Sequence, residues 1–91
     1  MLELEKTPEF RKQYRLMYKR GYDMSLLDDA LTKLTNEERL DAKYRDHPLR
    51  GKYIGSRECH IKDDWVLVYK KEKGRLRLTA MRTGTHQDVF D

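Results

Sequence analysis

The fold class is decided by one stretch in the second half of the chain, Arg57-Glu58-Cys59-His60-Ile61-Lys62-Asp63-Asp64-Trp65-Val66-Leu67-Val68-Tyr69. Side chains alternate over residues 57–62, which is typical of a half-buried strand. One face of that strand carries Cys59 and Ile61, and the other carries Glu58, His60 and Lys62. Residues 65–71 are rich in β-forming side chains, and the Asp63-Asp64 turn between the two runs makes them antiparallel neighbours.

Further strands are predicted on both sides of this pair. Residues 75–82 alternate again, with Leu76, Leu78 and Ala80 on one face, after a turn at Lys73-Gly74. Residues 1–6 alternate apolar and charged side chains, which also indicates a strand. Residues 51–54 are expected to add a short strand, and residues 35–50 to form a long polar loop.

Two helices are predicted between the first strand and the loop. Thr7 is the N-cap of the first helix, Pro8 its first residue and Gly21 its C-terminal cap. Its apolar stripe is Phe10, Tyr14, Met17 and Tyr18. The second helix has two rival caps, Ser25 and Asp23, and its apolar stripe is Leu27, Ala30, Leu31 and Leu34.

The order of elements predicts one α+β domain over residues 1–91. The short link Gly21-Tyr22 makes the helices an antiparallel hairpin, which we expect to pack on one face of a mainly antiparallel β-sheet. A chain of 91 residues buries a thin core. It is 40% charged, but its apolar residues are periodic and its net charge is only +4, which favours a folded domain.

The positive charge lies in the second half of the chain. Residues 1–46 hold ten Lys/Arg and ten Asp/Glu, whereas residues 47–91 hold ten Lys/Arg and six Asp/Glu. A localised basic field attracts nucleic acid, and the alternative is an ordinary solvated surface. The single cysteine, Cys59, excludes an intramolecular disulfide, and charges alternate from residue 3 with no signal peptide visible, so a reducing cytoplasm is expected.

All three histidines lie in this basic half. The turn after His60 can bring Asp64 beside its ring, so His60 is our first candidate for a base, and Trp65 is either a stacking platform or ordinary core. Arg82 enters from the end of the last strand and can hold a phosphate. His86 follows on a flexible tail and is a candidate acid, although a polar tail without a role is the alternative.

His47, the competing base, lies in the long loop, where Pro48 restricts its backbone. RNA cleavage needs a base, an acid, a cation for the phosphate and a stack for the bases, and this half of the chain contains all four. A zinc site built from His47, His60, His86 and Asp64 is the rival interpretation. The absence of any HExxH-like spacing argues against it.

Four motifs together resemble the YafQ branch of the RelE/ParE toxin superfamily, and the match covers the whole chain. They are Asp46-His47-Pro48-Leu49-x-Gly51, Arg57-Glu58-Cys59-His60-Ile61, Asp64-Trp65-x-Leu67-x-Tyr69 and Arg82-Thr83-Gly84-Thr85-His86. Tyr53 departs from the family, which often has tryptophan there. The ParE branch, which poisons gyrase, lacks this set of histidines.

The resemblance implies a RelE-like fold and a ribosome-dependent mRNA endoribonuclease that needs no cofactor. Its partners would be mRNA in the ribosomal A site and an acidic, DNA-binding antitoxin encoded alongside. It implies acid–base roles for His47, His60, Asp64 and His86, and a contact of Arg82 with the scissile phosphate. The residues expected to contact nucleotides are Trp65, Phe90, Arg57 and Lys52. A basic RNA- or protein-binding module that cuts nothing is the alternative function.

Overall fold

The computed structural model describes all 91 residues and contains one five-stranded sheet, in the order β1-β5-β4-β3-β2. The strands are β1 (Glu3–Lys6), β2 (His47–Pro48), β3 (Arg57–Lys62), β4 (Trp65–Glu72) and β5 (Arg77–Thr85). Only the pair β1–β5 is parallel, and the other three pairs are antiparallel. The predicted mainly antiparallel sheet is therefore confirmed.

Three α-helices accompany the sheet: α1 (Pro8–Lys19), α2 (Met24–Thr35) and α3 (His86–Phe90). The predicted start of α1 is confirmed, because the side chain of Thr7 accepts a hydrogen bond from the backbone N–H of Phe10. Asp23, rather than Ser25, is the N-cap of α2. Gly21 has a φ of 88° directly after α1, as expected for a C-terminal cap.

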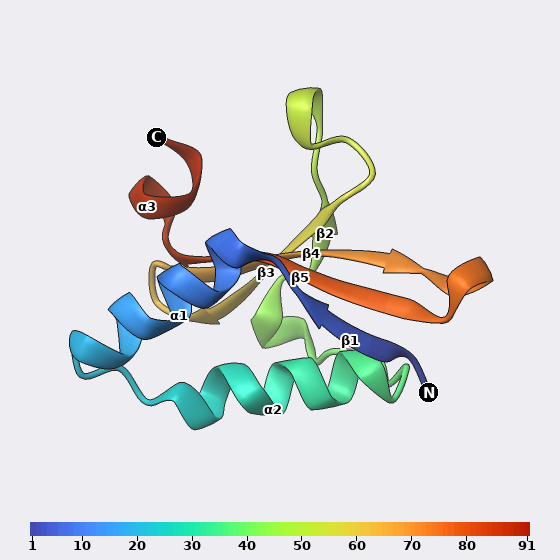
Figure 1. Ribbon diagram of the computed structural model, residues 1–91, viewed down its shortest axis with the longest axis horizontal. Helices are drawn as coiled ribbons and strands as arrows, with labels where there is room; N and C mark the ends of the chain where they lie inside the picture. Colours follow the sequence, from blue (N-terminus) through green and yellow to red (C-terminus); the bar gives the residue numbers. More distant parts are fainter.

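The sheet has a core on one face and the candidate site on the other. Helices α1 and α2 lie along one face, whereas α3 and the loop that follows β2 stand on the other side (Figure 1). The main core joins the helices to the sheet, and its largest fully buried members include Phe10, Met17, Leu27, Trp65, Leu67, Tyr69 and Leu78. The opposite face has a smaller cluster of Val66, Val68 and Val89, against which Phe90 packs.

Several local predictions are wrong. Tyr18 is 69% exposed, because it lies about 80° around the helix from Phe10. Leu76 is 60% exposed, since it takes a left-handed conformation after the 3-10 turn Lys73–Arg75. The predicted strand at residues 51–54 is a 3-10 turn, Gly51–Tyr53. Strand β5 starts at Arg77 and continues to Thr85, beyond the predicted end.

The long loop is also more ordered than predicted. It contains the 3-10 turn Ala42–Tyr44 and strand β2, which pairs with β3. None of the helices combines the length and the apolar character needed to span a bilayer.

Candidate active site

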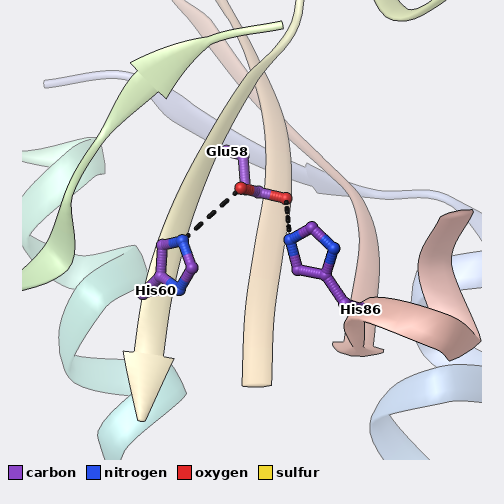
Figure 2. A group of neighbouring side chains, drawn as sticks. All are labelled: Glu58, His60 and His86. Atoms are coloured by element: carbon purple, nitrogen blue, oxygen red, sulfur yellow. Dashed lines mark ion pairs between the residues drawn. The ribbon is translucent and has the colours of Figure 1, made fainter. Parts of the chain in front are cut away.

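A buried carboxylate stands at the centre of the three histidines. Glu58 is 3% exposed, and its side chain lies on the sheet face opposite the helices. Its Oε1 lies 3.2 Å from Nε2 of His47 and 3.6 Å from Nε2 of His60, and its Oε2 lies 3.2 Å from Nε2 of His86. Figure 2 shows the rings of His60 and His86 pointing at this carboxylate from two different elements. The predicted grouping of the histidines is thus present, around a residue that we did not single out.

Each histidine reaches Glu58 from a different part of the fold. His47 lies on β2 directly opposite Glu58 in the strand register. His60 lies two residues after Glu58 on β3, so both side chains point to the same face of the sheet. His86 is the first residue of α3. The side chains of His47 and His86 are 46% and 51% exposed, so the cluster is open to a large substrate.

The burial of the Glu58 carboxylate is compensated by the histidines around it. Burying an unpaired carboxylate is costly, and the three imidazole Nε2 atoms that face Glu58 offset this cost. Glu58 Oε2 has no hydrogen-bond partner in the protein although Nε2 of His86 is close. The four side chains therefore form one polar unit centred on Glu58.

Arg45 makes a second set of contacts to the histidines. Its Nη2–H donates to Nδ1 of His60 over 3.1 Å, and its backbone carbonyl accepts from Nδ1–H of His47 over 2.7 Å. The backbone of Arg45 is left-handed, with φ 45° and ψ 44°. Sequence reasoning missed Arg45 because nothing in the spacing of a loop arginine predicts such a contact.

Helix α3 holds His86 in place, so the predicted flexible tail is wrong. Thr85 and Asp88 form a capping box at the start of α3. The Asp88 carboxylate also accepts from Arg20, over 2.6 Å, at the end of α1. The hydrogen bond from Arg20 is the main reason why the pKa of Asp88 is below its usual value. Gly84 allows this arrangement, because a Cβ there would lie 2.9 Å from Cβ of Asp88.

Aromatic side chains extend from the cluster toward the loop after β2. The rings of His86 and Phe90 are 4.9 Å apart between centroids, and those of Phe90 and Tyr53 are 5.4 Å apart. Nζ of Lys52 lies 5.3 Å from the centroid of Tyr53. The structure therefore places Phe90 between His86 and Tyr53, and Lys52 lies over the ring of its neighbour Tyr53.

Arg82 lies on the same face of the sheet as the cluster. It is opposite Val68 in the register of β4 and β5, and Val68 belongs to the apolar cluster on that face. Arg82 makes no ion pair and no side-chain hydrogen bond, in contrast to Arg20, Arg45 and Arg57. It is therefore a cation without a partner inside the protein.

Two predictions are wrong: that Asp64 lies beside the ring of His60, and that Trp65 contacts a nucleotide. Asp64 forms no ion pair or side-chain hydrogen bond, because its place in the turn leaves the side chain exposed, and Glu58 is the carboxylate beside His60. Asp64 contributes through its backbone carbonyl, which accepts from the N–H of His86 over 3.2 Å. Trp65 is 1% exposed, and its Nε1–H donates to Oγ1 of Thr83. It is therefore core, with no ring face open to a base.

Arg57 is also not where a nucleotide contact was expected. It alternates with Glu58 along β3, so its side chain points to the helix face of the sheet. There its Nε–H donates to Asp46 over 3.3 Å, and Asp46 also accepts from the hydroxyl of Tyr69 over 2.6 Å. Burial and the hydrogen bond to Asp46 raise the pKa of Tyr69. These contacts anchor the loop that carries Arg45 and His47.

The cluster also has the donor set of a metal site. One ligand atom each from Glu58, His60 and His86 lies within 4.8 Å of the other two. Two imidazoles and a carboxylate suit zinc or copper, and Oε2 of Glu58 has no protein hydrogen bond to lose. The zinc set considered from the sequence was wrong in two members, since neither His47 nor Asp64 belongs to this group, and it lacked Glu58.

Comparisons with known proteins agree with this fold. The chain matches the model of the family described as "Bacterial toxin of type II toxin-antitoxin system, YafQ" over residues 2–91. It is 39% identical over 89 residues to the mRNA interferase toxin YafQ of Escherichia coli K12, covering 97% of this chain and 95% of the relative. A metal-bound toxin from Helicobacter pylori superposes with a TM-score of 0.93 at 39% identity, over 99% of this chain and 100% of the other. The E. coli DinJ-YafQ complex contains a chain similar at a TM-score of 0.90 and 37% identity, over 100% of both.

Proposed function

The chain belongs to the YafQ family of bacterial toxins from type II toxin–antitoxin systems, and from this premise we propose how it acts on its substrate. Like the relative of nearly the same length, it is an mRNA interferase, which is an endoribonuclease. We propose that it acts in the cytoplasm and cuts mRNA in the ribosomal A site. The cut proceeds by attack of a 2′-OH on the adjacent phosphorus.

One observation carries this proposal: three imidazoles, from β2, β3 and α3, converge on one buried carboxylate at an open surface. In the proposed reaction a histidine takes the 2′-OH proton, and the 2′ oxygen attacks phosphorus. The bond from phosphorus to the 5′ oxygen breaks, and a second histidine gives its proton to that oxygen. The products are a 2′,3′-cyclic phosphate and a 5′-OH, and proton transfers of this kind typically contribute about 10²–10⁴-fold to a rate.

The surrounding residues support particular roles. His86 is our candidate acid, because α3 places it at the edge of the cluster with half of its side chain exposed. Arg82, which has no partner inside the protein, is available to bind the scissile phosphate through two of its guanidinium nitrogens. Phe90 and Tyr53 offer rings on which bases can stack, and Lys52 adds a cation beside them.

A metal bound by Glu58, His60 and His86 would supply Lewis-acid chemistry at the same place. We propose that cleavage does not require it, since acid, base and phosphate ligand are all available as side chains. A metal held by these side chains would also occupy imidazole lone pairs that proton transfer needs. Added copper or zinc is therefore expected to inhibit cleavage, and EDTA to leave it unchanged.

The cognate antitoxin is the expected partner of this toxin. The antitoxin DinJ is bound to the E. coli relative in the structure of their complex. We propose an acidic antitoxin here, whose carboxylates would cover the basic second half of the chain that otherwise attracts RNA. Growth should stop when the chain is expressed alone and resume when this partner is expressed with it.

A cleavage assay on translating ribosomes tests the mechanism. Wild-type protein should cut a message, and His86→Gln should cut it about 10²–10⁴-fold more slowly while folding normally. A message with a single 2′-deoxy nucleotide at the cut site should resist both proteins. Cleavage of the deoxy message would show that water attacks instead, and wild-type rates for His86→Gln would refute the role of His86.

The alternative is a module that binds RNA or protein without cutting. It predicts that wild-type protein leaves messages intact on ribosomes to which it binds. That result would overturn the proposed cleavage reaction. Toxicity would then come from binding through the basic surface.

A further inference from the structure

We propose that Thr7 is a positioning residue for cleavage, because it fixes a one-residue bulge in β5 that turns Arg82 toward the histidines. The inference rests on the function proposed above, in which Arg82 binds the scissile phosphate. Thr7 lies between β1 and α1 and makes no hydrogen bond to Arg82 or to any histidine. It acts through the backbone of β5.

The bulge lies where β5 pairs with β4. Tyr69 is opposite Ala80 and the preceding Val68 is opposite Arg82, so β5 has one residue, Met81, more than β4 can pair with. Side chains of a regular strand alternate between the two faces of the sheet. Here two consecutive side chains share a face, because Met81 packs against the smaller apolar cluster and Arg82 lies opposite a member of that cluster.

The position of the bulge decides the direction of Arg82. Ala80 is fully buried in the main core, and regular alternation from it would send the side chain of Arg82 to the same helix face. Thr83 also lies on the helix face, since it is opposite Leu67 of the main core. One extra residue must therefore fit between Ala80 and Thr83. A bulge at Met81 leaves Arg82 with the histidines, whereas a bulge one residue later would turn it toward the helices.

Thr7 holds the bulge at Met81 through two consecutive carbonyl groups. Its backbone N–H donates to the carbonyl of Ala80 over 3.1 Å, and its hydroxyl donates to the carbonyl of Met81 over 2.7 Å. Consecutive carbonyls of a regular strand point to opposite edges, so one residue reaches both because the strand bulges there. The same hydroxyl accepts from the N–H of Phe10 as the N-cap of α1. One side chain thus joins the bulge to the start of α1.

Three substitutions separate the two hydrogen bonds of the hydroxyl. Thr7→Ser keeps both bonds and is the matched control. Thr7→Asp keeps an acceptor for the N–H of Phe10, so α1 remains capped, but a carboxylate has no hydrogen to donate to Met81. Thr7→Val keeps the shape of the side chain and loses both bonds. Thermal unfolding should therefore give Thr7→Val the lowest Tm of the three.

Cleavage on ribosomes, with kcat and KM measured separately where each variant is folded, tests the role. Thr7→Asp and Thr7→Val should both lower kcat by about tenfold or more, since a misplacement of 1 Å can cost about 10²-fold, and Thr7→Ser should match the wild type. Arg82→Met should lower kcat at least as much. Adding Thr7→Asp to Arg82→Met should have no further effect, whereas a merely structural role of Thr7 would lower kcat in both backgrounds.

NMR of the free protein tests the direction of Arg82 without a substrate. In the wild type and in Thr7→Ser, nuclear Overhauser effects should join the β protons of Arg82 to the methyl groups of Val68, its neighbour on β4. In Thr7→Asp these effects should weaken or disappear, because the bulge is no longer held at Met81.

The outcomes separate the inference from the proposed function. Wild-type kcat in Thr7→Asp, a further loss when it is added to Arg82→Met, or unchanged contacts between Arg82 and Val68 would each overturn the inference while cleavage itself stands. Wild-type kcat in Arg82→Met would refute the proposed role of Arg82, and the role of Thr7 in cleavage with it. Wild-type protein that cuts nothing would refute the proposed function, and the NMR comparison would still decide whether Thr7 directs Arg82.

Discussion

Replacing Trp65 tests whether its side chain belongs to the core or stacks on a base of the RNA. The side chain is 1% exposed, donates to Thr83 over 2.9 Å and meets the ring of Tyr22 at 5.2 Å. Truncating a buried Trp to Ala typically costs about 3–5 kcal/mol. A domain of 91 residues has roughly 5–14 kcal/mol of stability in total, so this substitution removes a large fraction of it.

Thermal unfolding followed by circular dichroism measures this effect. At about 4–8 °C per kcal/mol for a domain of this size, Trp65→Ala should lower the Tm by roughly 12–40 °C. Trp65→Phe keeps most of the volume but loses the hydrogen bond to Thr83, so it should cost about 1–2 kcal/mol. Tyr18→Ala is the matched control, because Tyr18 is 69% exposed and its loss should change stability by less than about 0.5 kcal/mol.

The cleavage assay must run at a temperature where each variant is folded. There, Trp65→Phe should cut messages at nearly the wild-type rate, whereas Phe90→Ala should cut more slowly, with a smaller fall in Tm than Trp65→Ala because Phe90 is only half-buried. The reasoning fails if Trp65→Ala keeps the wild-type Tm and loses cleavage. That result would mean that the indole leaves the core to stack on a base.

Two further predictions concern the segment that positions His86. Asp88→Asn should destabilise the protein at neutral pH, because the Asp88 carboxylate accepts from Arg20. Arg20 lowers the pKa of Asp88 in the folded state, so this contribution is present above the unfolded pKa of about 3.9 and is lost as pH falls through the lower, folded value. Variant and wild type should therefore converge in unfolding experiments only as the pH falls below that folded value. Gly84→Ala should slow cleavage, because its Cβ would displace Asp88 and α3, whereas Gly74→Ala, whose Cβ would meet nothing within 4 Å, should cut normally in the same assay.

The layout of the fold was predictable because it depends on local patterns. The alternation in residues 57–62, the β-rich run after it and the Thr7 cap of α1 each predicted an element that the structure contains. The errors fall at positions where a turn interrupts the pattern. Leu76 continues the alternation in the sequence, but the chain turns there with a φ of 51°, which puts the side chain outside the core.

The centre of the site was not predictable in the same way. The alternation placed Glu58 on the same strand face as His60, and that was the available signal. A carboxylate on a strand is ordinarily solvated. Glu58 is buried only because β2 and α3 bring His47 and His86 over it, and these contacts join segments 11 and 28 residues away in the sequence. Local spacing instead suggested Asp64, which the turn leaves exposed.

Because side chains alternate along β3, neighbouring residues of this strand lie on opposite faces of the sheet. Glu58 and His60 belong to the site, whereas Arg57 and Cys59 point to the helices. Arg57 nevertheless affects the site, because with Tyr69 it holds Asp46, the residue between Arg45 and His47. Residues of the helix face therefore set the geometry of the loop that carries Arg45 and His47. A loss of cleavage in Arg57 or Tyr69 variants would accordingly reflect displaced histidines rather than a lost contact with RNA.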